Sequence, residues 1–437
     1  MTPVPGPLVA ATFDNGLAVL VGERPHGAQV VCALLVYHTG SARESKGTTG
    51  VSHFLEHMMF KGTGSLAKGE IDRLTQQAGG RNNAFTQQDY TAYYFALAAD
   101  RWTLALDIEA DRMRGCTLDP AEFALEKEVI LQELYGALDE PWGLLEQELW
   151  ATIYRQHPYR HPILGWRDDL ERLDVDAMRD HYRRYYHPAN ATLVVCGAVS
   201  APAVLDYARR TLGRIPPGPT VPPPDPALAE PDQVGARVVE IVGRTSATRV
   251  VIAHRGPRHG TVDHDALLLA EAILAEGKCS RLYQRLVDGE RLLRSIDAHA
   301  EGKREDGVFL LSAELVPGAE LARVEAALAE EVARLGREPV TADELARART
   351  QLETGHLFTL ERASSWAFAI GHYAAYGWLA GYHDYLERVA AVTPARIQDA
   401  AARHLRPERR TTGVHRPDPN DAHEDGDPDE LDEDADA

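Results

Sequence analysis

The sequence predicts an α+β protein built from two homologous α/β domains. The order of predicted strands and helices in the first half recurs in the second half, and each copy has about 200 residues, a normal size for one domain. A proline-rich stretch at residues 215–232, IPPGPTVPPPDPALAEPD, separates the copies and is typical of a semi-rigid linker. With 437 residues, 44% of them hydrophobic, the chain can bury the cores of two or three domains. We therefore expect an N-terminal domain at residues 1–214 and a C-terminal domain at 233–415.

The N-terminal copy begins with a predicted hairpin at Leu8–Val21. Apolar residues alternate on both sides of the segment Asp14-Asn15-Gly16, which is a strong turn signal. Val30–Tyr37 is a continuous apolar run, as in a buried strand. Further strands are predicted at Asn82–Leu97, which is rich in Thr, Tyr and Phe, and at Ala191–Val199.

Helical patterns lie between these strands. Besides a helix after Gly50, the predicted helices of this copy are Lys68–Ala78, Asp100–Arg114, Pro120–Leu138 and Val175–Tyr186. Asp119 is a good N-cap for the third of these, because proline follows it at the first helical position. This helix carries Glu126 and Glu133 on one face, since they are two turns apart. Two glutamates on one helix face are ordinarily exposed to solvent, but here apolar residues flank them.

The C-terminal copy repeats this order without histidines in the equivalent first helix. The matching segments are Arg249–His254, Asp265–Ala275, Gly307–Leu315, Glu320–Leu335 and Ala342–Leu360. The last of them corresponds to the helix that bears Glu133. Only the first copy therefore carries residues suited to bind a metal ion.

The segment Gly50–Gly64, GVSHFLEHMMFKGTG, contains the pattern His-x-x-Glu-His in His53, Glu56 and His57. On a helix these three positions share one face, so both imidazoles can reach one metal ion. Read backwards, the pattern is the His-Glu-x-x-His of zinc proteases, an arrangement known as inverzincin. The alternative is a core helix with two hydrogen-bonded histidines. A charged glutamate on an apolar helix is costly unless something pairs with it, which favours the metal site.

Composition narrows the classes of partner. The formal net charge is −20 and the pI is near 5.3, which argues against nucleic acid or an anionic membrane as the main partner. Residues 416–437 hold eleven acidic residues and one arginine, and predict a disordered tail without a catalytic role; a tail that binds a partner is the alternative. The four cysteines are far apart, and neither a signal peptide nor a transmembrane run is visible, so we expect a reducing, cytoplasmic location.

The chain resembles the pitrilysin–insulinase family of zinc metallopeptidases, and within it short bacterial members similar to the mitochondrial processing peptidase beta subunit. The segments that carry the resemblance are His53–Met58, Phe60–Thr63, Asn83–Thr86 with Asp89 and Tyr93, and Glu126–Glu133. The resemblance implies two similar domains, each with a mixed, mostly antiparallel sheet and helices, and two chains, identical or related, that pair around a cavity.

The resemblance also implies roles for individual residues. His53, His57 and Glu133 would bind one Zn²⁺ per chain, Glu56 would be the general base, and Glu126 would be a supporting carboxylate beside the site. A further set would contact the substrate: Asn83 and Ala84 on an edge strand, and Arg281 in Ser280–Gln284. Family members usually add a tyrosine, but its expected position holds Arg294.

These observations predict a zinc endopeptidase that hydrolyses unfolded peptides or presequence-like segments inside a chamber. The alternative is a non-catalytic peptide-binding or assembly subunit of a hetero-oligomeric peptidase, which the missing tyrosine favours and the intact metal residues oppose. A purely structural zinc site is usually closed by four Cys or His ligands, and the cysteines here lie far from the motif.

Overall fold

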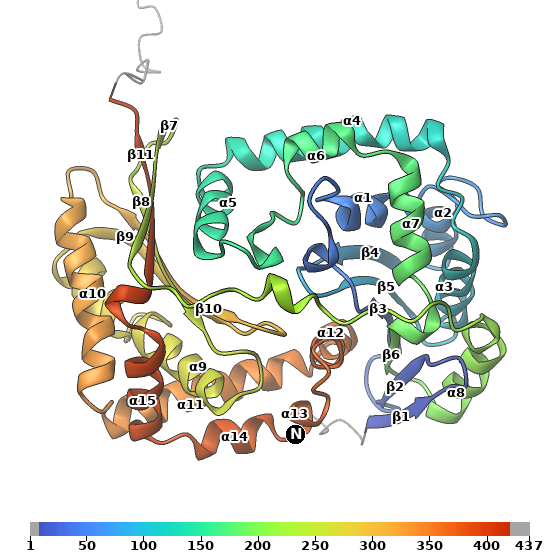
Figure 1. Cartoon of the computed structure of the whole chain (residues 1–437). Helices are drawn as coiled ribbons and strands as arrows, with labels where there is room; N and C mark the ends of the chain where they lie inside the picture. The colour runs from blue at the N-terminus through green and yellow to red at the C-terminus, as the bar shows by residue number, and fades with distance from the viewer. Residues whose placement is uncertain (1–7, 420–437) are drawn as a thin grey trace, which may run out of the picture.

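The computed structural model describes residues 8–419, which form two halves, each with one sheet and its helices (Figure 1). The first sheet has the strand order β1-β2-β6-β3-β5-β4 and the second the order β7-β11-β8-β10-β9. Within each sheet one strand pair is parallel, β2 with β6 and β7 with β11, and the others are antiparallel. The predicted fold of two α+β units with mixed, mostly antiparallel sheets is therefore confirmed.

The first sheet contains the predicted hairpin and buried strands. Its strands are β1 (Leu8–Thr12), β2 (Ala18–Glu23), β3 (Val30–Tyr37), β4 (Arg81–Thr86), β5 (Thr91–Ala98) and β6 (Ala191–Gly197). The helices of this half are α1 (Val51–Met58), α2 (Glu70–Gln77), α3 (Thr103–Gly115), α4 (Pro120–Asp139), α5 (Pro141–Ile153), α6 (Arg167–Arg172), α7 (Val175–Tyr185) and α8 (Ala201–Arg210). Asp119 caps α4 as expected, since its carboxylate accepts hydrogen bonds from the N–H groups of Ala121 and Glu122.

The second half repeats the predicted order of elements. Its strands are β7 (Arg237–Gly243), β8 (Arg249–Gly256), β9 (Leu293–Glu301), β10 (Gly307–Leu315) and β11 (Arg410–Pro417). Its helices are α9 (Val262–Leu274), α10 (Leu321–Arg337), α11 (Ala342–Thr359), α12 (Ala363–Ala375), α13 (Ala380–His383), α14 (Tyr385–Ala391) and α15 (Pro394–His404).

Strand β11 corrects the predicted start of the acidic tail. The expected tail begins at residue 416, yet Arg416 and Pro417 belong to β11 and Arg416 pairs with Glu240 of β7. Backbone pairing in the sheet thus extends two residues past the expected domain end at residue 415. Residues 420–437, which hold most of the predicted tail, lie outside the described residues.

The two halves exchange helices across their interface, which the sequence pattern did not predict. Helix α5 follows the N-terminal helix α4 but packs on the second sheet, where Leu145, Leu149 and Ile153 meet Val251 and Ala253 of β8 (Figure 1). Helix α12 of the C-terminal half covers the first sheet in return. Its Trp366 and Ile370 are fully buried against residues of β3 and β6. Each sheet therefore has one face covered by a helix from the other half, in a cluster separate from the main core of its own half.

A cluster of buried histidines lies where α12 meets α9 and the rest of its own half. The ring of His259 is 5.0 Å from the rings of both His264 of α9 and His372 of α12, and 5.1 Å from that of Tyr376. Burial and the neighbouring imidazoles lower the pKa of His259 to about 2. Burial also lowers the pKa of His264 and that of His372 to about 4, so this contact is assembled from neutral imidazoles.

Hydrogen bonds add to the apolar contacts between the halves. The carboxylate of Asp89 accepts from the Tyr159 hydroxyl at 2.8 Å and from the Arg304 backbone N–H at 3.2 Å. Lys303, which is almost fully buried, donates to the side chain of Gln88. Within residues 8–419 no helix is both long and apolar enough to cross a membrane.

Candidate metal centre

The helix that carries the His-x-x-Glu-His pattern is fixed at its N-terminus by a buried carboxylate. Glu44 accepts hydrogen bonds from the backbone N–H groups of Gly50, at 2.7 Å, and Ser52, at 2.8 Å. These donors have no partner within the helix, so Glu44 performs the task of a capping side chain from the preceding loop. Burial raises the pKa of Glu44 to about 7 against the opposing effect of these hydrogen bonds. Gly50 itself adopts the left-handed conformation, with φ of 86°, which a glycine tolerates best.

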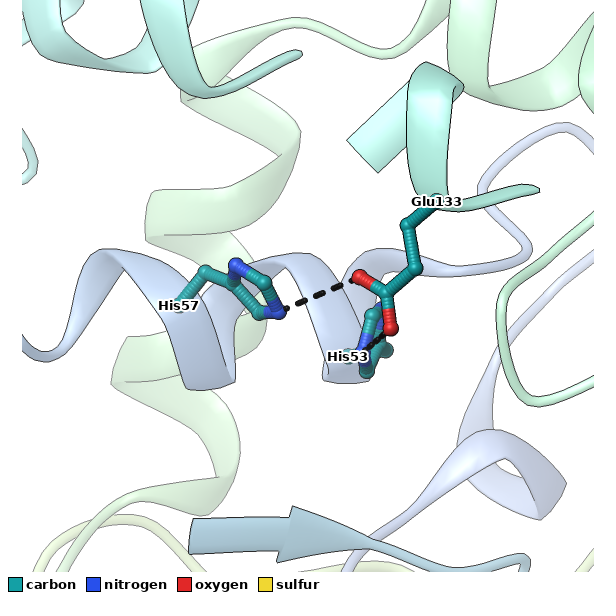
Figure 2. A group of neighbouring side chains, drawn as sticks. All are labelled: His53, His57 and Glu133. Atoms are coloured by element: carbon teal, nitrogen blue, oxygen red, sulfur yellow. Dashed lines mark ion pairs between the residues drawn. The ribbon is translucent and has the colours of Figure 1, made fainter. Parts of the chain in front are cut away.

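The structure brings His53, His57 and Glu133 together, as predicted. The two imidazoles project from α1 and the carboxylate reaches them from α4 (Figure 2). Glu133 lies 3.7 Å from Nε2 of His53 through one oxygen and 3.5 Å from Nε2 of His57 through the other. One ligand atom from each residue lies within 4.8 Å of the other two, which is close enough to surround a single ion.

The chemistry of these donors fits zinc. Nδ1 of His57 lies 3.0 Å from Oε1 of Glu126, and because a carboxylate only accepts, Nδ1 carries the proton and Nε2 keeps its lone pair. Burial lowers the pKa of His53 to about 3, with His57 adding to the effect, so this imidazole is neutral at pH 7. Two imidazole nitrogens and one carboxylate oxygen form the ligand set of many catalytic zinc sites, which leave a fourth position for water.

Glu126 connects the centre to a nearby cation. Its second oxygen accepts from the ammonium of Lys61 at 2.5 Å. Burial opposes ionisation of Glu126, but the bonds from Lys61 and His57 outweigh it and hold the pKa of this carboxyl below its ordinary value. Glu126 is therefore a carboxylate at neutral pH, which orients the imidazole of His57 and increases its basicity.

Glu56 lies on the same helix but outside the group of three. Its Oε2 accepts a hydrogen bond of 2.6 Å from the hydroxyl of Thr86 on β4. Burial raises the pKa of Glu56, and the bond from Thr86 opposes that shift. A buried carboxylate with a raised pKa, next to a metal site, is suited to take up and release a proton.

The predicted substrate contacts lie on two separate elements. Asn83 and Ala84 lie on β4, the edge strand of the first sheet, which packs beside α1. Asn83 is exposed and Ala84 is buried. Arg281 lies in the C-terminal half, where its guanidinium binds both oxygens of Glu344 on α11, at 2.6 and 2.9 Å. The structure thus places Asn83 and Ala84 on the strand beside α1, and Arg281 in the C-terminal half against α11.

Arg294, at the position where a tyrosine was expected, lies at the start of β9. Its guanidinium donates to Glu314 of β10 at 3.0 Å, and Glu314 also pairs with Arg249. Arg294 therefore has a structural partner within its own sheet.

Two family profiles match consecutive parts of this chain. Residues 18–166 match the profile described as insulinase, peptidase family M16, and residues 172–352 match the profile described as the peptidase M16 inactive domain. The first match contains all three candidate ligands, and the second, which runs from the end of α6 into α11, contains none of them. The chain belongs to peptidase family M16.

Relatives of this M16 chain match it over nearly its whole length. The zinc protease PqqE of Helicobacter pylori is 26% identical over 410 residues, which cover 93% of this chain and 92% of that protein. An uncharacterized zinc protease of Streptomyces coelicolor is 26% identical over 401 residues, covering 91% of this chain and 87% of the relative. These relatives and the family identify the chain as a zinc protease.

Solved structures of the family share the fold. The crystal structure of a protease from Helicobacter pylori superposes with a TM-score of 0.91 at 26% identity, covering 95% of this chain and all of that one. A structure from Pseudomonas fluorescens described as a peptidase M16 inactive domain has a TM-score of 0.86 at 18% identity and covers 94% of this chain and 98% of its own.

Three residues of the centre were not assigned a role from the sequence of this M16 protease: Glu44, Lys61 and Thr86. Lys61 and Thr86 fall inside segments that carried the family resemblance, which was the available signal. Glu44 gave none, because a carboxylate six residues before Gly50 lies outside the usual spacing of a helix cap.

Proposed function

We propose that this M16 zinc protease is an endopeptidase that hydrolyses unfolded peptides or presequence-like segments inside a chamber formed by paired domains. The observation that carries the proposal is the convergence of His53, His57 and Glu133 from two helices, with Glu56 beside them on the same helix as the histidines. One zinc ion per chain would bind to these three ligands.

Zinc, when bound, would supply a Lewis acid for the scissile carbonyl and would lower the pKa of a bound water to about 7. Glu56 would hold the proton lost by the attacking water and deliver it to the leaving amine. The hydrogen bond from Thr86 holds the carboxylate of Glu56 in one orientation on the β4 side of α1. Glu126 keeps the proton of His57 on Nδ1, so that Nε2 stays available as a ligand.

Strand β4 supports an extended substrate. It occupies the edge of its sheet and pairs with β5 on one side, so a substrate segment can add along the other side through backbone hydrogen bonds. Asn83 and Ala84 would lie along that segment. Backbone pairing depends little on sequence and requires an unfolded chain, which favours peptides over folded proteins as substrates.

We further propose that two chains, identical or related, pair around the chamber. Arg281 and Arg294 are both bound to glutamates of their own half, at positions where the family resemblance implied an arginine and a tyrosine that reach the substrate. A related subunit that supplies these groups would agree with this arrangement, and the non-catalytic subunit is the corresponding alternative function. Cytoplasmic location stays a prediction.

The test is the Glu56→Gln variant of the full chain. We expect it to bind zinc as the parent does and to lose hydrolysis of an unstructured fluorogenic peptide, because only the proton acceptor is removed. The matched control is Glu122→Gln, whose parent side chain lies on α4 and pairs with the exposed Lys68. Activity of Glu56→Gln at the parental rate would refute the proposed base.

Peptide cleavage by the chelator-treated parent, with and without added zinc, distinguishes the endopeptidase from the non-catalytic subunit. A parent that cleaves no peptide with or without added zinc, while its mass in solution shows a single chain, would favour the non-catalytic subunit.

A further inference from the structure

The C-terminal half has a cavity at the place that corresponds to the metal centre of the N-terminal half. Helix α9 packs on α11 and beside the edge strand β9, just as α1 packs on α4 and beside the edge strand β4. Gly355 follows the N-cap Thr341 of α11 by fourteen residues (355 − 341), as Glu133 follows the N-cap Asp119 of α4 (133 − 119). A cavity of about 390 Å³ lies there, between α9, α11 and α12.

One acidic residue of the centre has a counterpart in this cavity, and the three metal ligands do not. Glu271 of α9 accepts a hydrogen bond of 2.7 Å from the backbone N–H of Ala300 on β9, as Glu56 accepts one from β4. Leu268 and Ala272 stand at the places of His53 and His57. Gly355 stands at the place of Glu133. The cavity thus keeps a carboxylate but lacks a ligand set for zinc.

Acceptors and aromatic rings dominate the wall of the cavity. Besides Glu271, the lining includes Glu276, Gln351, Tyr373 and Tyr385, and no lysine or arginine is among its described residues. Its one histidine, His356, has a pKa lowered by burial, so it adds no positive charge at neutral pH. The amide N–H of Gln351 donates to the carbonyl of Glu276 at 3.2 Å, while its buried amide oxygen has no hydrogen-bond partner. Burial raises the pKa of Glu271, and the bond from Ala300 and the neighbouring His299 oppose that shift.

A cation beside the cavity already has its own partners. Arg388 lies against the ring of Tyr385, at 5.9 Å, but its guanidinium binds both oxygens of Asp265 and one oxygen of Asp384. Its charge is therefore already neutralised.

We propose that this cavity binds the side chain of an arginine in a peptide. A guanidinium would donate to the carboxylate of Glu271 and the free oxygen of Gln351, and its plane would stack on a tyrosine ring. The choice of a peptide as the molecule that carries the guanidinium rests on the proposed function. The C-terminal half, which lacks the zinc ligands, would then take part in peptide binding by holding a basic side chain.

The experiment compares two peptides that differ in one atom group. A fluorescent unstructured peptide with one arginine and the same peptide with citrulline are titrated against the full-length Glu56→Gln chain, so that no hydrolysis disturbs the binding. We expect the citrulline peptide to bind roughly ten- to hundredfold more weakly, because citrulline keeps the shape but loses the charge. Glu271→Gln should abolish this difference, since glutamine still accepts from Ala300 but carries no charge.

Two further variants serve as a control and as an independent test of the cavity. Glu353→Gln removes an exposed charge from α11 outside the cavity and should leave the preference for arginine unchanged. Gly355→Leu places a side chain in open space at the cavity, where it should weaken binding of the arginine peptide. Because leucine has a higher helix propensity than glycine, this variant should fold and tests the site even if Glu271→Gln misfolds. Equal affinity of the two peptides for the Glu56→Gln chain, or a preference that survives both Glu271→Gln and Gly355→Leu, would overturn the proposal.

The outcome is independent of catalysis. Failure of the proposed endopeptidase shows as an inactive zinc-loaded parent, whereas failure of the arginine site shows in the binding comparison, whatever the parent hydrolyses.

Discussion

Replacing Glu126 by glutamine tests whether the carboxylate beside His57 sets the strength of metal binding. The side chain of Glu126 is only 9% exposed, accepts from Nδ1 of His57 at 3.0 Å and also binds Lys61. Glutamine keeps one acceptor oxygen but removes the charge, and its NH₂ group would face a donor on one of these two sides. Loss of such a supporting carboxylate typically weakens metal affinity about 10- to 100-fold, which corresponds to about 1.4–2.8 kcal/mol.

The assay is competition for Zn²⁺ between the purified chain and a chromophoric chelator of known affinity. Glu122→Gln is the matched control, because Glu122 lies one turn earlier on α4 and forms an equally short ion pair with Lys68 at 2.6 Å. We expect that control to bind zinc as the parent does. Unchanged affinity of Glu126→Gln, or an equal loss in Glu122→Gln, would refute the reasoning and reduce Glu126 to a surface charge.

Three other perturbations have outcomes that follow from burial. Glu44→Ala leaves two backbone donors of α1 without their acceptor and should lower the free energy of unfolding by about 1–3 kcal/mol in a urea titration; an unchanged midpoint would contradict its role as a cap. Trp366→Ala should cost about 3–5 kcal/mol in the same titration, since the indole is 1% exposed in the core that α12 shares with the first sheet, and a loss below 1 kcal/mol would argue against this docking. His259, His264 and His372 have pKa values in the folded chain well below 6.5, so the unfolded chain binds more protons in acid. The free energy of unfolding is therefore undiminished by these groups above about pH 6.5. It falls as the pH drops towards 4, by up to about 1.4 kcal/mol per pH unit for each group. Thermal melts between pH 7 and 4.5 measure this dependence of stability on pH. The slope should decrease in His372→Phe, and an unchanged slope would disprove that these histidines cause it.

The metal centre was predictable from sequence to the extent that its geometry is local. His53, Glu56 and His57 lie on one helix, so their spacing alone places them on one face. Glu133 lies on another helix, and its position became predictable only through the family resemblance. The contact of Lys61 with Glu126 depends on how the chain leaves α1, for which no periodic pattern exists.

The repeated order of strands was likewise predictable, because apolar runs and turn signals are local. The exchange of α5 and α12 was not. Both helices carry apolar residues on the face they bury, but such a face does not specify which of two similar sheets it will cover. That choice is made by packing between residues more than a hundred positions apart: Leu149 shares a buried cluster with Val251, and Trp366 shares one with Leu34.

The exchange has a consequence for the metal centre itself. Helix α4, which carries Glu133, ends at Asp139, and α5 begins at Pro141, so a single residue connects them. Because α5 is buried on the second sheet, the C-terminal end of α4 is attached to the C-terminal half within two turns of Glu133. The third ligand is thus positioned by both halves, although the histidines and the ligand itself all belong to the first. The half without ligands therefore contributes to the geometry of the centre through α5, and the proline-rich linker does not divide the chain into a complete catalytic part and an accessory part.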